Sequence, residues 1–254
     1  MSCMVRLATW LAIAFCAATS LPGQAEEIYV AAAANLRSAL SEGIGPAFEA
    51  RTGHHLKVAF GSTGNFYAQI RNGAAFDILL AADEATPEKL ELDGLTAPGS
   101  RFTYATGALV LWSSQRGFVD GNGDILHSDK FKHIAIANPK LAPYGAAAVE
   151  SLRALNLYDS LQDKIVRGED INQTYQFVAT GNAPLGFVAL SQIMRKGAVA
   201  SGSYWLVPAK LYTPIHQDAV ILAKARAKVG AAILARYLQG DEAREILRSY
   251  GYTF

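Results

Sequence analysis

Cysteine is almost absent from this sequence. The 254 residues contain only Cys3 and Cys16. Both lie in an N-terminal stretch with one charge, Arg6, an apolar run at 7–18 and Gly-Gln-Ala at 23–25. This pattern predicts a secretory signal peptide over 1–25 that is cleaved after Ala25. A chain cut there has no cysteine, which excludes disulfides, thiolate metal ligands and a cysteine nucleophile from the mature protein.

Two other interpretations of the leader each lack a necessary feature. A membrane anchor needs roughly 20 consecutive apolar residues, and the run at 7–18 is much shorter. A lipoprotein anchor at Cys16 needs a small residue before the cysteine, where this chain has Phe15. We therefore expect a soluble protein that is secreted to the periplasm.

An excess of either charge is also missing. The chain has 23 Lys and Arg against 22 Asp and Glu, and removal of Arg6 with the leader leaves 22 of each. A balanced chain has no electrostatic footprint for nucleic acid or for an anionic membrane surface. Hydrophobic residues make up 51% of the sequence, which is enough for one large or two small cores.

The sequence lacks the common catalytic motifs. It has no Gly-x-x-x-x-Gly-Lys, Gly-x-Gly-x-x-Gly, Gly-x-Ser-x-Gly or His-Glu-x-x-His pattern. His54 and His55 follow Gly53, and we expect them in a solvated loop rather than at a metal. Asp83 and Glu84 follow a strand pattern and suit a helix start better than an acid/base pair. We expect no catalytic residue and no enzyme activity.

The chain does contain an alternation of short apolar runs and helical patterns. Such alternation predicts βαβ units around mostly parallel sheets. A first cycle of strands and helices is expected at 28–33, 36–51, 56–60, 66–71 and 76–81. A long β pattern at 104–112 leads to a second cycle at 134–137, 146–155, 164–166, 171–180, 185–188 and 190–196. The chain is expected to end with β runs at 204–207 and 219–222 and helices at 229–238 and 242–250.

Small or neutral polar residues follow several of these strands at a helix start. They occur at Ala34-Asn35, Ser62-Thr63, Tyr144-Gly145-Ala146 and Asp170-Ile171. The first turn of a helix has unpaired backbone N–H groups and the positive end of the helix dipole, which together can hold an anion without a cationic side chain. In doubly wound sheets such starts meet at the carboxyl ends of the strands. The alternative is an ordinary helix cap at each position, worth about 1 kcal/mol, and spacing alone leaves both open.

Six segments, in this order, resemble those of the periplasmic molybdate-binding proteins. They are Ala-Ala-Ala-Ala-Asn-Leu at 31–36, Phe-Gly-Ser-Thr-Gly at 60–64, Ala-Ala-Asp-Glu at 81–84, Asn-Pro-x-x-Ala-Pro-Tyr-Gly at 138–145, Ala-Pro-Leu-Gly-Phe-Val at 183–188 and Pro-Ile-x-Gln-Asp-Ala-Val at 214–220. The resemblance implies an α/β, type II periplasmic-binding fold with a ligand cleft between two lobes, each a mixed, mostly parallel sheet flanked by helices. The implied lobes are 26–103 with 211–254, and 104–210.

The resemblance also implies the ligand, molybdate or tungstate, and its contacts. Carried over by motif, the contact residues are Asn35, Ser62, Thr63, Tyr144 and Ile171, the last two through their backbone N–H groups. Molybdenum would be bound only as the oxyanion, and no cofactor is implied. One branch of the family has a tyrosine after Gly-Phe-Val whose hydroxyl contacts the anion, and this chain has Ala189 there. The chain therefore resembles the branch in which asparagine replaces the usual serine of the first loop.

The implied function is capture of the oxyanion by a monomeric periplasmic protein for the membrane permease of an ABC importer. A site with donors only favours an anion that is fully deprotonated near neutral pH, because the O–H of a protonated phosphate would lack an acceptor. Sulfate has the same charge and would be excluded by cavity size. The alternatives are a receptor for another oxyanion or a small organic acid, and a periplasmic hydrolase or transferase, which needs a nucleophile or base that the expected site lacks.

Overall fold

The first sheet combines segments from both ends of residues 25–254, the part of the chain that the computed structural model describes. Apart from Ala25, the predicted signal peptide over 1–25 lies outside the described residues. In spatial order the strands β2-β1-β3-β12-β4 are His55–Gly61, Glu27–Ala33, Ile78–Leu80, Ile215–Ile221 and Phe102–Gly107. Strands β2, β1 and β3 are parallel, and β12 runs antiparallel to both of its neighbours. The sheet is therefore mixed, with two parallel and two antiparallel pairings.

The second sheet repeats this arrangement with the middle of the chain. In spatial order its strands β11-β5-β8-β6-β7 are Ser203–Leu206, Leu109–Ser113, Leu185–Ala189, Ile134–Ala137 and Ile165–Gly168. Strands β6, β7 and β8 are parallel, whereas β5 is antiparallel to β8 and β11. Every residue of β6 and β8 is buried, as expected for parallel strands that are covered on both faces.

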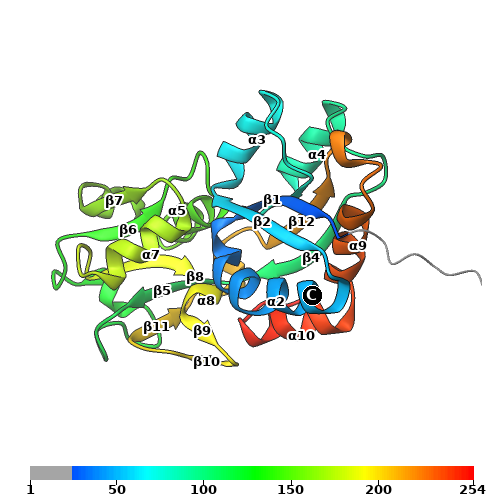
Figure 1. Ribbon diagram of the computed structural model, residues 1–254. Coiled ribbons are helices and arrows are strands. Elements are labelled where there is room, and N and C mark those ends of the chain that lie inside the picture. The colour runs from blue at the N-terminus through cyan, green and yellow to red at the C-terminus, as the bar shows by residue number, and fades with distance from the viewer. Residues whose placement is uncertain (1–24) are drawn as a thin grey trace, which may run out of the picture.

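Helices cover both faces of each sheet (Figure 1). Those of the first lobe are α1 (Arg37–Ala39), α2 (Gly45–Thr52), α3 (Thr63–Arg71), α4 (Ala85–Leu92), α9 (Val229–Leu238) and α10 (Asp241–Ser249). Those of the second lobe are α5 (Pro143–Ala154), α6 (Tyr158–Leu161), α7 (Ile171–Ala179) and α8 (Leu190–Ile193). Each lobe has one hydrophobic cluster on either side of its sheet. None of the described helices is long and apolar enough to cross a membrane.

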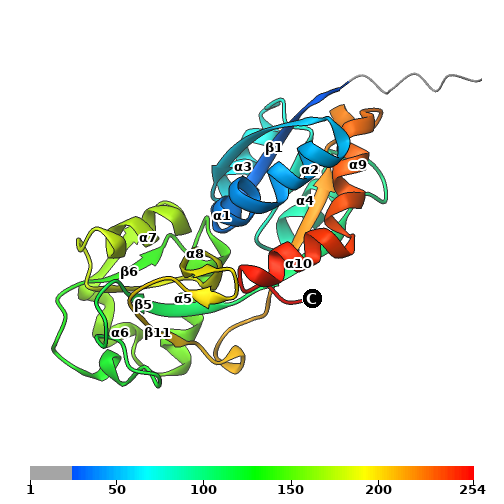
Figure 2. The same ribbon diagram turned by 60° about the horizontal axis from the view of Figure 1, so that its bottom comes forward.

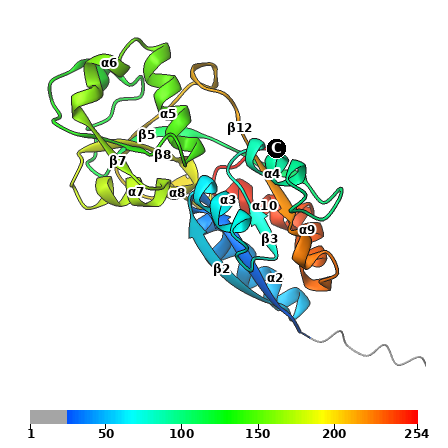
Figure 3. The same cartoon turned by 90° about the horizontal axis from the view of Figure 1, so that it is seen from above.

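The lobes are joined by two crossings of the chain (Figures 2 and 3). The β pattern at 104–112 is not one segment, as predicted, but the end of β4 and most of β5, which belong to different sheets. The chain changes sheet at Ala108, somewhat later than the expected lobe boundary at 103/104. It returns between β11 and β12, a stretch that contains the expected boundary at 210/211.

Two helices differ from the prediction: one is interrupted and the other ends early. The one expected at 36–51 consists of a 3-10 turn (Ala34–Leu36), α1, a π-helical turn (Leu40–Ile44) and α2. Pro46 explains the break before α2, because its nitrogen carries no hydrogen and its ring excludes the normal bond to the residue four earlier. The helix expected at 190–196 ends at Ile193, and the chain continues as a small hairpin of β9 (Met194–Arg195) and β10 (Ala198–Val199).

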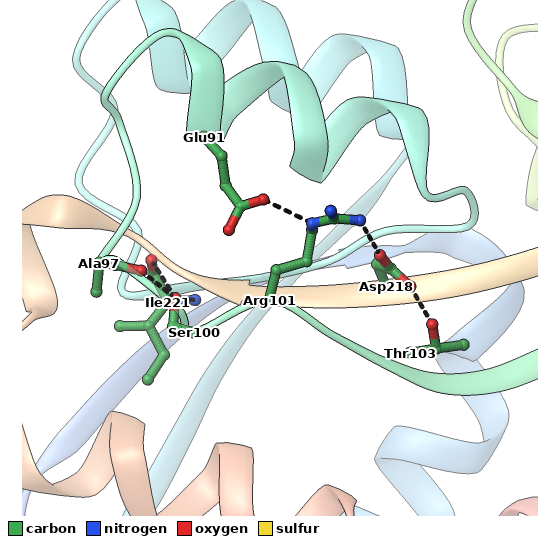
Figure 4. A network of polar contacts seen from close by, with 7 residues as sticks. All are labelled: Glu91, Ala97, Ser100, Arg101, Thr103, Asp218 and Ile221. Atoms are coloured by element: carbon green, nitrogen blue, oxygen red, sulfur yellow. Dashed lines mark hydrogen bonds and ion pairs between the residues drawn. The ribbon is translucent and has the colours of Figure 1, made fainter.

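A polar network fixes the strand β12 beside β4 (Figure 4). The Asp218 carboxylate, only 2% exposed, accepts hydrogen bonds from the Arg101 guanidinium at 3.0 Å and the Thr103 hydroxyl at 2.7 Å. Arg101 also pairs with Glu91 of α4 at 2.6 Å. Gln217, its neighbour in β12, contacts Asn35 and Tyr144 instead, and the pairing with β4 shifts register between the two residues.

His54 is buried, so its prediction as part of a solvated loop is wrong. Its side chain is 6% exposed, its Nδ1 accepts a hydrogen bond from the Glu26 N–H at 3.1 Å, and its ring stacks on Phe48. His55 is exposed at the start of β2. Within residues 25–254, no group of three or more His, Cys, Asp and Glu could hold a metal ion.

Candidate functional site

The helix starts of both lobes meet at one small cavity. It is lined by Ala33, Ala34, Asn35, Gly61, Ser62, Thr63 and Ala82 of the first lobe and by Ala142, Pro143, Tyr144, Asp170 and Ile171 of the second. All five expected contact residues are therefore brought together. The volume is about 10 Å³, close to the space that one ordered water needs. The cavity lies at the carboxyl ends of β1, β2, β6 and β7, where open α/β sheets bind ligands.

Ser62 and Thr63 begin α3 with hydroxyls whose protons are free. The Ser62 Oγ caps the helix by accepting from the Asn65 N–H at a long 3.4 Å. The Thr63 Oγ1 accepts from the Ala82 N–H at 3.0 Å, which ties α3 to the end of β3. A hydroxyl that accepts keeps its own proton for donation, so both side chains can donate toward the cavity.

Helix α5 begins with the sequence Pro143-Tyr144-Gly145. Proline at the first helical position has no N–H to leave unpaired. The N–H of Tyr144 lies in the first turn and makes no backbone hydrogen bond within residues 25–254. A Cβ at Gly145 would overlap the carbonyl of Ala137. Glycine thus allows α5 to start directly against the end of β6, and the Tyr144 N–H is a free donor at the cavity.

Helix α7 brings Ile171 and also a carboxylate, which corrects the expectation of a site without one. Asp170 lines the cavity, but its Oδ1 accepts from the Gln173 N–H at 2.8 Å as an ordinary helix cap. The Ile171 N–H has no backbone partner among the described residues. Gln192 holds this turn in place: its Nε2 donates to the Ile171 carbonyl and its Oε1 accepts from the Ala189 N–H, both at 3.0 Å.

Asn35 is not a helix cap, so the alternative considered from the sequence does not apply to it. It lies inside the 3-10 turn and caps nothing through its side chain. It is 1% exposed, and its Nδ2 donates to the Gln217 Oε1 at 2.9 Å and to the Tyr252 hydroxyl at 2.8 Å. Its Oδ1 is buried without a hydrogen-bond partner among residues 25–254. Its carbonyl accepts from the Ser191 hydroxyl at 2.9 Å, across the lobes.

Gln217 lies beneath the site and was not assigned a role from the sequence. It is fully buried and its Nε2 donates to the Tyr144 hydroxyl at 3.0 Å. Its Oε1 is 2.9 Å from the Tyr104 hydroxyl, which is also 2.7 Å from the Ala81 carbonyl. The segment Pro-Ile-x-Gln-Asp-Ala-Val contains this glutamine, but nothing local in it indicates a contact with Asn35.

The buried tyrosines beneath the site are neutral. Burial raises the pKa of Tyr104 and of Tyr144 well above the ordinary value, and it also raises the pKa of Tyr252. Because a phenol in an apolar surrounding keeps its proton, none of the three carries a negative charge at neutral pH. The groups beneath the site are therefore dipoles rather than ions.

A larger cavity of about 470 Å³ adjoins the site on the acidic side of the cleft. Its lining includes the carboxylates of Asp83, Glu84, Glu88 and Glu150. Like charges repel, and the effect is strongest where the surroundings are poorly solvated. This cavity is therefore unsuited to an anion, although it is much the larger of the two.

Known proteins similar to this chain share its fold. Residues 28–253 match the family model described as bacterial extracellular solute-binding protein. A molybdate-binding protein of Azotobacter vinelandii is 54% identical over 229 residues, 90% of each chain, and one of Rhodobacter capsulatus is 47% identical over 242 residues, 95% and 94% of the two chains. A solved A. vinelandii periplasmic molybdate-binding protein aligns with a TM-score of 0.87 at 42% identity, covering 89% of this chain and 99% of that one. The predicted two-lobe fold is confirmed.

Proposed function

Because this chain belongs to the bacterial extracellular solute-binding proteins, we propose that it captures molybdate or tungstate in the periplasm for the membrane permease of an ABC importer. The chain is a binding protein and not an enzyme, as its family is. Relatives in two organisms that bind molybdate support the choice of ligand. The predicted signal peptide and a monomeric state belong to the same proposal.

The observation that carries the proposal is a set of hydrogen-bond donors from both lobes around one small cavity. The first lobe contributes the hydroxyls of Ser62 and Thr63, and Asn35 lines the cavity beside them. The second contributes the free N–H groups of Tyr144 and Ile171. Three helices, α3, α5 and α7, begin at the cavity, and the positive ends of their dipoles favour an anion.

The same donors favour a dianion without a proton. The one carboxylate in the lining, Asp170, is engaged with its own helix. A protonated phosphate would bring an O–H that finds few acceptors, and leaving a buried donor unpaired costs about 1–3 kcal/mol. Sulfate carries the same charge as molybdate, so its exclusion would depend on its smaller size.

Ligand entry requires the lobes to separate. They are in contact on both sides of the cavity, through the Gly64 N–H with the Leu141 carbonyl and the Ser191 hydroxyl with the Asn35 carbonyl, each at 2.9 Å. With the lobes in contact, the cavity between them measures only about 10 Å³, so the anion needs the lobes apart to enter or leave. We expect hinge motion at the two crossings of the chain, a common mode of closure in periplasmic receptors.

Calorimetric titration and thermal melting with molybdate, tungstate, sulfate and phosphate test the proposal. A ligand at about 1,000 times its dissociation constant should stabilise the protein by about 4 kcal/mol. Molybdate or tungstate should therefore raise the melting temperature, and phosphate, the control anion, should not. Stabilisation by sulfate or a small carboxylic acid alone would support the alternative receptor and refute the molybdate assignment.

A further inference from the structure

The hydrogen bonds beneath the site demand more protons than one tyrosine can supply. The Tyr104 hydroxyl lies within hydrogen-bond distance of two acceptors, the Ala81 carbonyl at 2.7 Å and the Gln217 Oε1 at 2.9 Å. A phenol has a single proton. One of these two contacts therefore places two oxygens together without a hydrogen between them, which is unfavourable in a fully buried place.

Two other groups of the network are also poorly matched in this arrangement. The Asn35 Oδ1 is buried and accepts from no group among residues 25–254. Among the described residues, the Tyr144 hydroxyl has one hydrogen bond, which it accepts from the Gln217 Nε2 at 3.0 Å. The amide ends of Asn35 and Gln217 are involved in each of these mismatches.

Rotating both amides by 180° removes these three mismatches, although it creates another at Tyr252. The Gln217 Nε2 would then donate to the Tyr104 hydroxyl and to the Asn35 Oδ1, and the Tyr104 proton would serve the Ala81 carbonyl. The Tyr144 hydroxyl would donate to the Gln217 Oε1. Neither amide can rotate alone, because at 2.9 Å their facing ends would become two oxygens or two N–H groups.

The contact between Asn35 and Tyr252 survives this rotation. The Tyr252 hydroxyl, which now accepts from the Asn35 Nδ2 at 2.8 Å and donates to the Asn35 carbonyl at 3.1 Å, would donate to the Asn35 Oδ1 instead. The Asn35 carbonyl would lose that bond, because a phenol has one proton, but it keeps its bond from the Ser191 hydroxyl at 2.9 Å. The rotated network thus leaves the two N–H groups of the Asn35 Nδ2 without a partner and the Tyr252 and Asn35 oxygens in contact, so neither state satisfies every group until an anion accepts from Asn35.

We propose that the oxyanion selects the rotated state, in which Gln217 holds Asn35 with its Nδ2 toward the anion. Gln217 is then a positioning residue of the site. With the unrotated pair, the free end of Asn35 is an oxygen, which a dianion repels. With the rotated pair it is a donor, and hydrogen bonds from N–H groups to an anion are among the strong ones. This inference rests on the proposed function.

The same rotation links the two lobes. Gln217 belongs to β12 of the first sheet, and Tyr144 belongs to the first turn of α5, whose N–H lies at the cavity. Reversing their hydrogen bond makes this contact between lobes depend on the state of Asn35. This hydrogen bond has space only because residue 107 is glycine. A Cβ at Gly107 would overlap both the Tyr144 hydroxyl and the Gln217 amide.

NMR of the isotope-labelled protein, with and without molybdate, tests the orientation of Gln217. Without ligand, the Nε2 protons of Gln217 should show cross-peaks to the ring of Tyr144, and at saturating molybdate to the ring of Tyr104. The amide of Asn72, which bonds the Ala68 carbonyl on the exposed side of α3 at 2.9 Å, is the internal control and should not change.

Calorimetry on the same sample separates the two possible failures. Molybdate binding with the Gln217 cross-peaks still on Tyr144 overturns this inference and leaves the proposed function intact. No heat of binding with molybdate overturns both.

A pair of matched variants tests the positioning role through affinity. Gln217→Met keeps the size of the side chain but removes its amide, and should weaken molybdate binding more than tenfold. Gln239→Met removes an exposed amide that bonds the Ala235 carbonyl at 3.0 Å, and should bind as the parent does. Parent affinity in Gln217→Met overturns the inference. Weaker binding also overturns the inference if the Asn35 amide resonances of Gln217→Met shift on ligand addition as they do in the parent. The loss of affinity would then be a purely structural effect.

Discussion

The substitution Asn35→Asp tests the first loop most sharply, because it changes the charge of the site with almost no change in shape. Asn35 is 1% exposed and lines the cavity. Two unit charges about 4 Å apart cost about 4 kcal/mol at an effective dielectric constant of about 20, so a dianion would feel up to about 8 kcal/mol. Repulsion between the carboxylate and the dianion would therefore abolish binding if the carboxyl stayed ionised.

Protonation of the introduced carboxyl limits this penalty. With an ordinary pKa of about 3.9, holding the proton at pH 8 costs about 5.6 kcal/mol, which is less than the repulsion. The bound state should therefore take up a proton, and molybdate affinity at pH 8 should fall by about 10⁴-fold. The loss is smaller if burial already raises the pKa of the carboxyl in the free protein.

The pH dependence of molybdate affinity measures this directly. Affinity of Asn35→Asp should recover about tenfold for each unit by which the pH falls, or about 300-fold between pH 8 and pH 5.5. The control Asn172→Asp places a carboxylate at the neighbouring cavity, which Asn172 lines, and should show a much smaller loss. Parent affinity of Asn35→Asp at pH 8 would refute the assignment of Asn35 to the site.

Two further substitutions separate binding from stability. Ser62→Ala removes a weak cap, since the bond of Ser62 to the Asn65 N–H is 3.4 Å long, and the unfolding free energy should fall by at most about 1 kcal/mol. Molybdate affinity should fall about 10- to 100-fold, because a bond to an anion is lost. A calorimetric affinity equal to the parent's would contradict this. Burial raises the pKa of Asp83, so its stabilising contribution is lost as the pH rises from about 3.8 through the raised pKa. The unfolding free energy of Asp83→Asn, measured by urea denaturation, should therefore exceed that of the parent at pH 7 and lose this excess at about pH 3. A difference that does not depend on pH would argue against the raised pKa of Asp83.

The parts of the site that the sequence predicts are those encoded locally. Ser62 and Thr63, or Asp170 and Ile171, follow their strands directly, so a strand pattern and a helix start within a few residues are enough to place them. The alternation of apolar runs places the carboxyl ends of these strands at one edge. The six motifs add the order of the segments, and the five predicted residues do line one cavity.

The support beneath the site could not be predicted, because its contacts join distant parts of the chain. Asn35 reaches Gln217 across 182 positions and Tyr252 across 217. No periodicity or spacing relates such residues. The same holds for His54, whose burial depends on Glu26 and on the ring of Phe48.

The passage between the lobes was predicted at 103/104, but its exact position could not be, for a different reason. Residues 102–107 and 109–113 are both β-forming, half buried in the first strand and fully buried in the second, so the pattern contains no signal for a change of sheet. The change follows from pairing partners, β12 for the first strand and β8 and β11 for the second. Those partners lie far along the chain and are chosen by packing rather than by local preference.

No lysine, arginine or histidine among residues 25–254 lines the proposed site, which suits a reversible binder. The guanidinium groups at the neighbouring cavity are engaged elsewhere, Arg37 over the Phe60 ring at 4.4 Å and Arg195 with backbone carbonyls such as that of Met194 at 2.8 Å. A guanidinium bound to the anion would belong to one lobe and would keep its hold after opening, because such pairs are strong and bidentate. Donors divided between lobes act together only while the lobes are closed. Separation of the lobes would therefore remove the donors of one lobe at once, and the anion, left with the contacts of the other, would be exposed to water that competes for it.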